Sequence, residues 1–243
     1  MIQVIVIPAR MSGTRLPGKP LIPINGMPMI WHVWSKCKEI HDAKLIYIAT
    51  EDIEIEEYCA EMQINCVNTG PARTAIDRIK LFADEISADS YINVQGDEPI
   101  VNPEDIKTIL LYNKKYPKRV VFGKTPCNEI EFNDFSKAKV VCSQSGRLMY
   151  SSRAGIPITN KGQFYSAQRA IWIYAFNKKS LDNYFNNEDA ELEKIEDNEI
   201  IRFLELDIPV FCVDVIGNSW AVDEIKDVAK AEKLIKKRLK NHE

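Results

Sequence analysis

The chain has 243 residues, which allows one large α/β domain or a domain with a small appendage. Its hydrophobic fraction of 45% is sufficient for a buried core. The net charge of −3 excludes a protein that binds nucleic acid or membranes through its overall charge, so any anionic ligand must be held by local positive charge. No apolar run approaches transmembrane length and no signal-peptide pattern is present, so we expect a cytoplasmic protein without membrane insertion.

Cysteine and histidine show no metal-binding pattern. The 6 cysteines include no C-x-x-C pair, and the 3 histidines make no metal-ligand spacing with them or with each other. We therefore expect reduced, buried thiols and no structural zinc site.

Short apolar runs and amphipathic patterns alternate through the first part of the chain. The apolar runs predict strands at 2–7, 45–50, 64–67 and 90–95. Helical spacing of apolar residues predicts helices at 28–40, 53–62, 74–86 and 102–112. This alternation is typical of an α/β fold with a Rossmann-like, doubly wound, mostly parallel sheet.

The pattern changes at about residue 122. The sequence SQSG at 143–146 separates two apolar runs, which indicates a β-hairpin, and a further strand is predicted at 170–176. We therefore expect a smaller antiparallel lobe or insertion at about 122–176, within a single domain that spans residues 1–243. Helical periodicity then predicts a helix at 191–206, followed by a strand at 210–215 and a last helix at 229–239.

The sequence GTRLPGKP at 13–20 differs by one residue from a P-loop, G-x-x-x-x-G-K-[ST]. Pro20 has neither the hydroxyl that would reach Mg²⁺ nor a backbone N–H, and no apolar helical turn follows it. We therefore reject the interpretation as a damaged P-loop.

Three cations nevertheless gather in this loop. Arg10, Arg15 and Lys19 follow the first predicted strand, with small residues between them. Open α/β sheets bind ligands at the carboxyl ends of their strands, and a triphosphate would match this charge. The alternative is a solvated basic loop, but the joint placement of the three cations favours a phosphate site.

Longer motifs carry a family resemblance. The sequences IPARMSGTRLPGKPL and NVQGDEP resemble the cytidylyltransferases that activate sugar acids, and most closely the CMP-Kdo synthetases (3-deoxy-manno-octulosonate cytidylyltransferases). The weaker motifs KVV, YSSRAGIP, IYAFNKK and AVDEIKDV follow in the family's order, so the resemblance covers nearly the whole chain. It implies a nucleotidyltransferase that uses CTP, a 2-keto sugar acid and Mg²⁺, releases pyrophosphate, and serves cell-surface polysaccharide synthesis.

The resemblance also implies roles for particular residues. Lys19, Arg15 and Asp97 would be catalytic, and Asp97 and Asp223 would hold Mg²⁺, with a two-metal arrangement expected. Alternatively, Asp97 is a turn residue before Pro99 and Asp223 is a helix N-cap. The implied nucleotide-binding residues are Pro8, Ala9, Arg10, Ser12, Gly13, Thr14, Arg15, Lys19, Arg73, Thr74, Arg78, Gln95 and Gly96.

The departures from the family fall where the acceptor sugar is expected. The implied acceptor-binding residues are Gln95, Arg153, Trp172, Tyr174, Glu199 and Arg202. Where the family has H-x-S-G-T-[DE]-R, this chain has ARTAIDR at 72–78, and Ala170, Trp172 and Ile200 replace a histidine, a glycine and a glutamine. If Trp172 shares the face of Tyr174, it makes the acceptor pocket smaller or less polar. The prediction is an acid other than Kdo itself, such as an amino-substituted one; alternatively, Trp172 lies on a core face and the pocket keeps its size.

Two other classes of protein stay open. One is a relative that binds nucleotide without turnover, which the joint presence of Lys19, Asp97 and Asp223 argues against. The other is a Rossmann-like dinucleotide-binding module, which would need a G-x-G-x-x-G sequence that is absent after the first strand. By family analogy alone, the protein is expected to be a homodimer.

Overall fold

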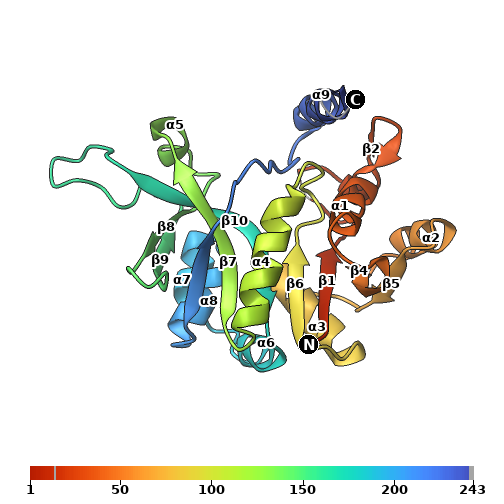
Figure 1. The fold of residues 1–243 in the computed structure, drawn as a ribbon, viewed down its shortest axis with the longest axis horizontal. Coiled ribbons are helices and arrows are strands. Elements are labelled where there is room, and N and C mark those ends of the chain that lie inside the picture. The colour runs from red at the N-terminus through yellow and green to blue at the C-terminus, as the bar shows by residue number, and fades with distance from the viewer. Residues whose placement is uncertain (14, 241–243) are drawn as a thin grey trace.

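One mixed sheet runs through the chain in the computed structural model, which describes residues 1–13 and 15–240 (Figure 1). Along its main path the strand order is β11-β7-β10-β6-β1-β4-β5. The strands on this path are β11 (Val210–Asp214), β7 (Val120–Cys127), β10 (Ala167–Phe176), β6 (Ser90–Val94), β1 (Gln3–Pro8), β4 (Ile46–Thr50) and β5 (Asn65–Asn68). Off this path, β8 (Lys139–Cys142) pairs with β10 and with β9 (Leu148–Ser152). A separate small hairpin joins β2 (Pro23–Ile24) to β3 (Met27–Pro28).

The parallel part of the sheet surrounds β1. This strand pairs in parallel with β4 and β6, and β4 pairs in parallel with β5. On the other side β11 and β7 are also parallel, whereas β10 runs antiparallel between β6 and β7. The predicted α/β fold with a mostly parallel sheet is therefore confirmed, with an antiparallel strand in the middle of it.

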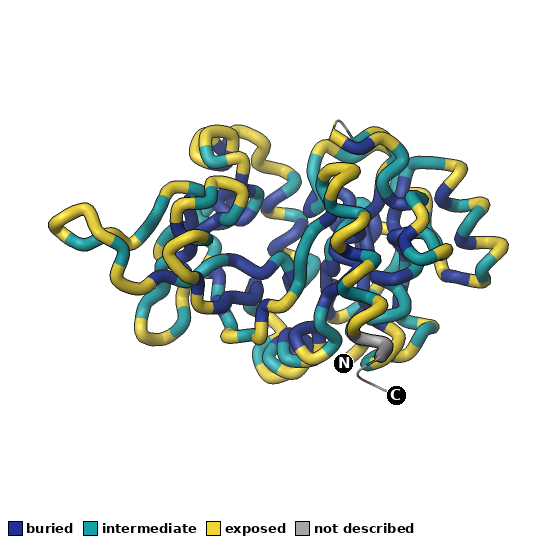
Figure 2. Tube along the Cα trace, turned by 90° about the horizontal axis from the view of Figure 1, so that it is seen from above, coloured by how far each residue is buried: buried dark blue, intermediate teal, exposed yellow. Residues whose placement is uncertain are grey.

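Helices cover both faces of the sheet. Alternate residues of β1 point to opposite faces, so Val4 and Val6 belong to one core cluster while Ile5 and Ile7 belong to the other. The first cluster includes residues of α3 (Ala75–Glu85), α6 (Lys178–Phe185) and α8 (Ile200–Glu205). The second includes residues of α1 (Met29–Lys38), α2 (Ile53–Glu61) and α4 (Pro103–Lys115). Figure 2 shows the buried segments gathered in the middle of the molecule, beneath exposed outer turns.

Among the described residues, the remaining helices contribute no fully buried residue to these two clusters. They are η1 (Lys19–Leu21), η2 (Ala43–Leu45), α5 (Glu129–Phe132), α7 (Glu191–Glu196) and α9 (Ile225–Lys240). Across the described part of the chain, no helix combines the length and the apolar character that crossing a membrane requires.

The antiparallel segment is continuous with the main sheet. The hairpin predicted around residues 143–146 is confirmed as the β8–β9 pair. Both β7 and β10 belong to the main path of the sheet, and only the β8–β9 hairpin lies off it. The division of residues 122–176 into a lobe stays a prediction. The sequence analysis did not predict α6, although Asn177 caps it by accepting a hydrogen bond from the Ser180 amide.

The single helix predicted at 191–206 is wrong. The chain forms α7 and α8 instead, separated at Asp197, which has a left-handed backbone with φ 46. Aspartate tolerates this conformation better than most residues. The break was not predicted because the apolar residues on both sides of it have the spacing of a helix. At this break, residues 197–199 line the pocket described next.

Candidate active site

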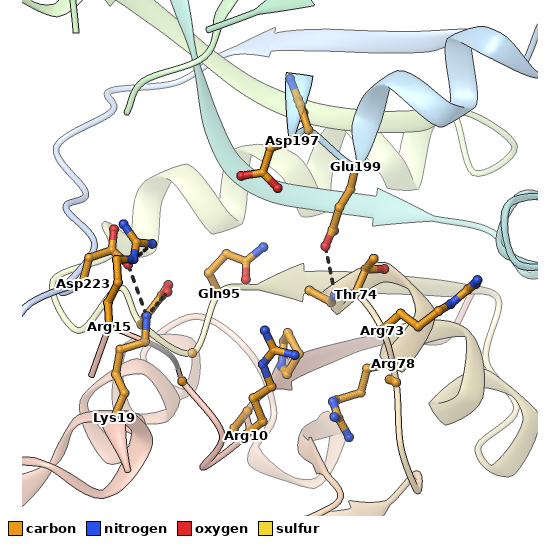
Figure 3. A pocket seen from close by; sticks show the side chains of 18 of the residues that line it. Arg10, Arg15, Lys19, Arg73, Thr74, Arg78, Gln95, Asp197, Glu199 and Asp223 are labelled. Atoms are coloured by element: carbon orange, nitrogen blue, oxygen red, sulfur yellow. Dashed lines mark hydrogen bonds and ion pairs between the residues drawn. The ribbon is translucent and has the colours of Figure 1, made fainter. Parts of the chain in front are cut away.

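A pocket of about 580 Å³ opens at the carboxyl ends of β1 and β6 (Figure 3). Its walls come from the loops after these strands, the start of α3, the α7–α8 break and the segment before α9. The structure brings together at this pocket most of the predicted site residues: Pro8, Ala9, Arg10, Gly13, Arg15, Lys19, Arg73, Thr74, Arg78, Gln95, Gly96, Asp97, Glu199, Arg202 and Asp223.

The loop after β1 folds back on Met11. The amides of Gly13 and Gly18 both donate to the Met11 carbonyl, at 2.9 Å each. Gly18 has φ 69, a left-handed conformation that favours glycine, and the chain then enters the 3-10 helix η1 at Lys19. Pro20 is buried in this helix. The proline that interrupts the P-loop pattern therefore fixes the turn that presents Lys19 to the pocket.

Lys19 lies between the two predicted metal-binding aspartates. Its Nζ atom is 2.7 Å from Asp97 Oδ2 and 3.4 Å from Asp223 Oδ1. Arg15 Nη2 is 3.0 Å from the same Asp223 oxygen. Two carboxylates that are far apart in sequence thus meet at one ammonium group. Figure 3 shows Lys19 and Arg15 beside Asp223.

A glycine and a backbone hydrogen bond make this meeting possible. A Cβ atom on Gly96 would lie 2.6 Å from the Pro8 carbonyl oxygen, so only glycine lets the turn after β6 approach the end of β1. The Val222 amide then donates to the Asp97 carbonyl at 2.9 Å. This bond places Asp223 beside Asp97.

Asp223 does not cap helix α9, whereas Asp97 lies in the turn that follows β6. Helix α9 begins at Ile225, and the amides of Asp223 and Glu224 donate to the carboxylate of Asp227. Capping at this end therefore falls to Asp227. The carboxylates of Asp97 and Asp223 are left to bind Lys19 and Arg15.

The arginines of the pocket differ in whether a carboxylate of the protein already pairs with them. Arg78 is buried, lies 3.2 Å from Glu51 and donates to Thr69 at 2.8 Å, and its burial lowers its pKa. Arg73 pairs with Asp77 at 3.0 Å and also with Glu188. Within residues 1–13 and 15–240, Arg10 forms no ion pair although it lines the pocket. Arg10 is thus the lining arginine whose charge is least balanced.

The opposite wall comes from α7, α8 and the break between them. Arg202 is buried, pairs with Glu193 and stacks on the Tyr184 ring at 3.9 Å. Glu199 accepts a hydrogen bond from the Ala75 amide at 3.0 Å, at the start of α3. The sequence analysis missed five other lining residues here: Glu188, Glu193, Lys194, Asp197 and Asn198. The Asp-Asn pair was the available signal, since both residues tolerate a left-handed turn that ends a helix.

Several predicted site residues do not line this pocket. These are Ser12, Arg153, Trp172 and Tyr174; Thr14 lies outside the described residues. Arg153 lies behind the wall, where its guanidinium donates to Asp197 Oδ2 at 3.2 Å.

Trp172 stacks in a column of aromatic rings instead of entering the pocket. Its ring centre is 6.0 Å from that of Tyr174, which in turn is 5.5 Å from Phe176. Tyr174 is buried, and Ala170 and Ile200 are buried in the same core cluster. Trp172 does share the face of Tyr174, but this face packs against core residues. The interpretation that Trp172 narrows the pocket therefore finds no support in its placement.

The environment of Glu199 moves the titration of its carboxyl group toward neutral pH. Burial disfavours the ionised carboxylate and raises its pKa from 4.5 to about 7, although the amide of Ala75 opposes this effect. The folded state therefore binds the proton more tightly than the unfolded chain does. The stability that Glu199 contributes is full below pH 4.5 and is lost as the pH rises through about 7.

We expect Glu199→Gln to become more stable relative to the wild type as the pH is raised from about 5 to about 8, by about 1 kcal/mol or more. Glutamine keeps an oxygen that can accept from Ala75 but carries no charge at any pH. Urea unfolding of both proteins at the two pH values measures the difference. Glu104→Gln, at an exposed position on α4, should show no such trend. An equal stability difference at both pH values would contradict the assignment.

Comparisons with known proteins agree with this geometry. A family model described as "Cytidylyltransferase" matches residues 4–208. The 3-deoxy-manno-octulosonate cytidylyltransferase of Escherichia coli is 31% identical and aligns over 97% of both chains. The 8-amino-3,8-dideoxy-manno-octulosonate cytidylyltransferase of Shewanella baltica is 30% identical, over 94% of this chain and 96% of that one.

Solved structures extend the comparison to the fold. The structure of CMP:2-keto-3-deoxy-manno-octonic acid synthetase complexed with CTP matches with a TM-score of 0.92 and 29% identity, over 98% of this chain and 100% of that chain. A glucose-1-phosphate thymidylyltransferase from Bacillus anthracis, at 15% identity and a TM-score of 0.68, shares the fold alone. Because the family model and the full-length relatives cover nearly the whole sequence, this chain belongs to the cytidylyltransferase family.

Proposed function

We propose that this enzyme transfers CMP from CTP to a sugar acid of the 2-keto type and releases pyrophosphate. The observation that carries the proposal is the meeting of Asp97 and Asp223 at Lys19, in a pocket whose wall also contains Arg10 and Arg15. A hydroxyl of the acid attacks the α-phosphorus of CTP. The new bond joins that oxygen to the α-phosphorus, the bond from the α-phosphorus to the bridging oxygen of the β-phosphate breaks with its electron pair leaving on pyrophosphate, and the hydroxyl proton passes to solvent water.

The cations of the loop after β1 are suited to the leaving group. Arg10 has no ion pair within the described residues, and Arg15 is exposed, so both can contact the β- and γ-phosphates. Negative charge grows on the pyrophosphate as its bond to the α-phosphorus breaks. Fixed positive charges that are already in place stabilise this charge without reorganisation, which accelerates the reaction.

The residues present fit Mg²⁺ as the cofactor. Asp97 and Asp223 supply carboxylate oxygens, which hard divalent cations prefer. The described residues contain no group of three or more His, Cys, Asp or Glu that could hold a metal ion. Mg²⁺ in enzymes of this kind is bound through one or two carboxylates together with substrate phosphates. When bound, Mg²⁺ would polarise the α-phosphate and steady the leaving oxygens. A two-metal arrangement stays a prediction.

Removal of divalent cations should abolish turnover. We expect pyrophosphate release to fall to background after exhaustive chelation and to return with Mg²⁺ or Mn²⁺, but not with Zn²⁺, because the predicted ligands are all oxygens. The assay is pyrophosphate release with each metal added back to the chelated enzyme. Full turnover in the absence of divalent cations would contradict the proposed role of Asp97 and Asp223.

The proposed acceptor is a sugar acid, and the residues that line the pocket bear on which acid it is. Ile200 is buried in the core and Trp172 packs against the core, so the altered wall at Ala72–Ala75 is the departure from the family that lines the pocket. The proposal of a modified acid therefore rests on the altered wall at Ala72–Ala75 alone. The relatives include enzymes named for Kdo and for its 8-amino derivative, so both acids belong in any test.

The proposal is tested by pyrophosphate release with a panel of nucleoside triphosphates and sugar acids. We expect turnover with CTP, and a higher kcat/KM for an amino-substituted acid than for Kdo. A kcat/KM for Kdo that no other acid matches would refute the modified-acid proposal and leave a plain Kdo enzyme. CTP binding without turnover with any acid would favour the non-catalytic relative. Light scattering checks the predicted homodimer, and cell fractionation checks the predicted cytoplasmic location.

A further inference from the structure

The segment that carries Asp223 has no regular structure of its own. Residues 215–224, here called the strap, join β11 to α9 and form neither helix nor strand. Figure 1 shows the strap crossing from the sheet to helix α9, which packs beside the β2–β3 hairpin. Backbone hydrogen bonds hold the two ends of the strap, from the Val215 amide to the Lys124 carbonyl and from the Val222 amide to the Asp97 carbonyl. Between these ends, the strap is held by the side chains described below, so these side chains contribute to the position of Asp223.

Asp105 binds the strap where it leaves the sheet. One carboxylate oxygen accepts a hydrogen bond from the Ile216 amide at 2.7 Å, and the other accepts from the Gly217 amide at 2.9 Å. Asp105 lies in the first turn of α4 and is fully buried. Charged hydrogen bonds of this kind are stronger than neutral ones, and leaving the two amides unpaired would be costly. Asp105 does not line the pocket.

Two other side chains bind the carbonyl groups of the same two residues. Arg169 donates to the Gly217 carbonyl at 2.8 Å, and its own position is fixed by Glu131 at 2.9 Å. Thr125 donates to the Ile216 carbonyl at 3.3 Å. Gly217 has φ 75, and a Cβ atom there would lie 2.5 Å from the Thr125 side chain. The strap is therefore bound at both its amides and its carbonyls, in a conformation that requires glycine.

The fixed peptides lie a few residues before the active site. At the other end of this stretch, the Val222 amide donates to the Asp97 carbonyl, and Asp223 reaches Lys19. We propose that Asp105 is a positioning residue of the enzyme: by holding the Ile216 and Gly217 amides it fixes the strap so that the Asp223 carboxylate lies beside that of Asp97. This inference rests on the proposed function, in which these two carboxylates bind the metal.

The test measures metal binding directly. We expect Asp105→Asn to weaken the binding of Mn²⁺ in the presence of CTP by about tenfold or more, as loss of an outer-shell partner does in other metal sites. The asparagine keeps one acceptor oxygen but presents an NH₂ group to the second amide. The probe is the electron paramagnetic resonance signal of free Mn²⁺, titrated into protein with CTP and no acceptor. CTP affinity in metal-free buffer should change by less than about threefold, because Asp105 does not touch the nucleotide pocket.

A neighbouring carboxylate provides the matched control. Glu104→Gln makes the same change of charge in the same turn of α4, but Glu104 is exposed and its side chain contacts Lys107. We expect this variant to bind Mn²⁺ and CTP like the wild type. An equal loss of Mn²⁺ affinity in Glu104→Gln would show a general effect of charge near α4 and would overturn the positioning role of Asp105.

A second variant keeps the inference testable if Asp105→Asn does not fold. Gly217→Ala disturbs the same peptide from its other side and leaves the buried carboxylate in place. It should also weaken Mn²⁺ binding while CTP binding in metal-free buffer is kept. Mn²⁺ binding equal to the wild type in Gly217→Ala, or in folded Asp105→Asn, would overturn the proposal. Failure of the wild type to release pyrophosphate would count against the proposed function alone, since the Mn²⁺ titration does not depend on turnover.

Discussion

Asp97→Asn is expected to lower the rate of pyrophosphate release by about a hundredfold or more and to leave the fold intact. The substitution is nearly isosteric, and the Asp97 carbonyl that accepts from Val222 is unchanged. Asparagine can still accept a hydrogen bond from Lys19, but it has lost the negative charge that would hold Mg²⁺. Steady-state turnover at saturating CTP and Mg²⁺, together with the thermal unfolding midpoint, measures both effects.

This experiment separates the two interpretations of Asp97. Asparagine is as good a turn residue as aspartate, so a purely structural role predicts a variant that resembles the wild type. A rate within about threefold of the wild type would therefore show that Asp97 acts only in the turn before Pro99. Glu104→Gln, which removes an exposed carboxylate away from the pocket, is the control for general charge effects.

Lys19→Ala should reduce turnover by about a hundredfold to a thousandfold and weaken CTP binding much less. The Lys19 ammonium contacts both aspartates and lies beside Arg15, where the phosphates are expected to bind. Charge on the leaving pyrophosphate is greater in the transition state than in bound CTP, so a fixed cation acts mainly on the rate. The measurement is kcat from pyrophosphate release, with the Kd for CTP from calorimetry.

Loss of CTP affinity with an unchanged kcat would contradict this role, because it would show that Lys19 binds the substrate and the transition state equally. Lys107→Ala is the matched control. Lys107 is exposed on α4 and pairs only with Glu104, at 3.2 Å, among the described residues. It should leave kcat and the Kd for CTP unchanged.

Much of the fold was predictable because its signals are local. The run at 2–7 reads as a strand buried on both faces, and β1 pairs on both edges with all of Val4–Ile7 buried. The start of α4 was predicted from Asn102 and Pro103, and the Asn102 side chain does accept from the Glu104 amide. Each of these features depends on residues within one or two turns of chain, so the sequence contains the information needed to place it.

Other features were not predictable because they depend on distant contacts. The order of strands along the sheet, with antiparallel β10 between β6 and β7, is a set of non-local pairings. The left-handed residue Asp197 splits a segment whose apolar periodicity reads as one helix. The alternation along β10 correctly puts Trp172 on the face of Tyr174, but it gives no indication whether that face meets a pocket or the core.

The candidate active site also combines features with local sequence signals and features that depend on distant contacts. Residue types and spacing predicted the candidate site: cations after the first strand, Asp97 after β6, Gly96 for close approach, and Asp223 through the family resemblance. The packing of remote segments was needed to show that Lys19 contacts both aspartates, that Asp105 binds the strap, and that burial raises the pKa of Glu199 to about 7. The physical reason is that residue type and spacing set local conformation and available charge, whereas distances between charges and their burial arise when remote segments pack together.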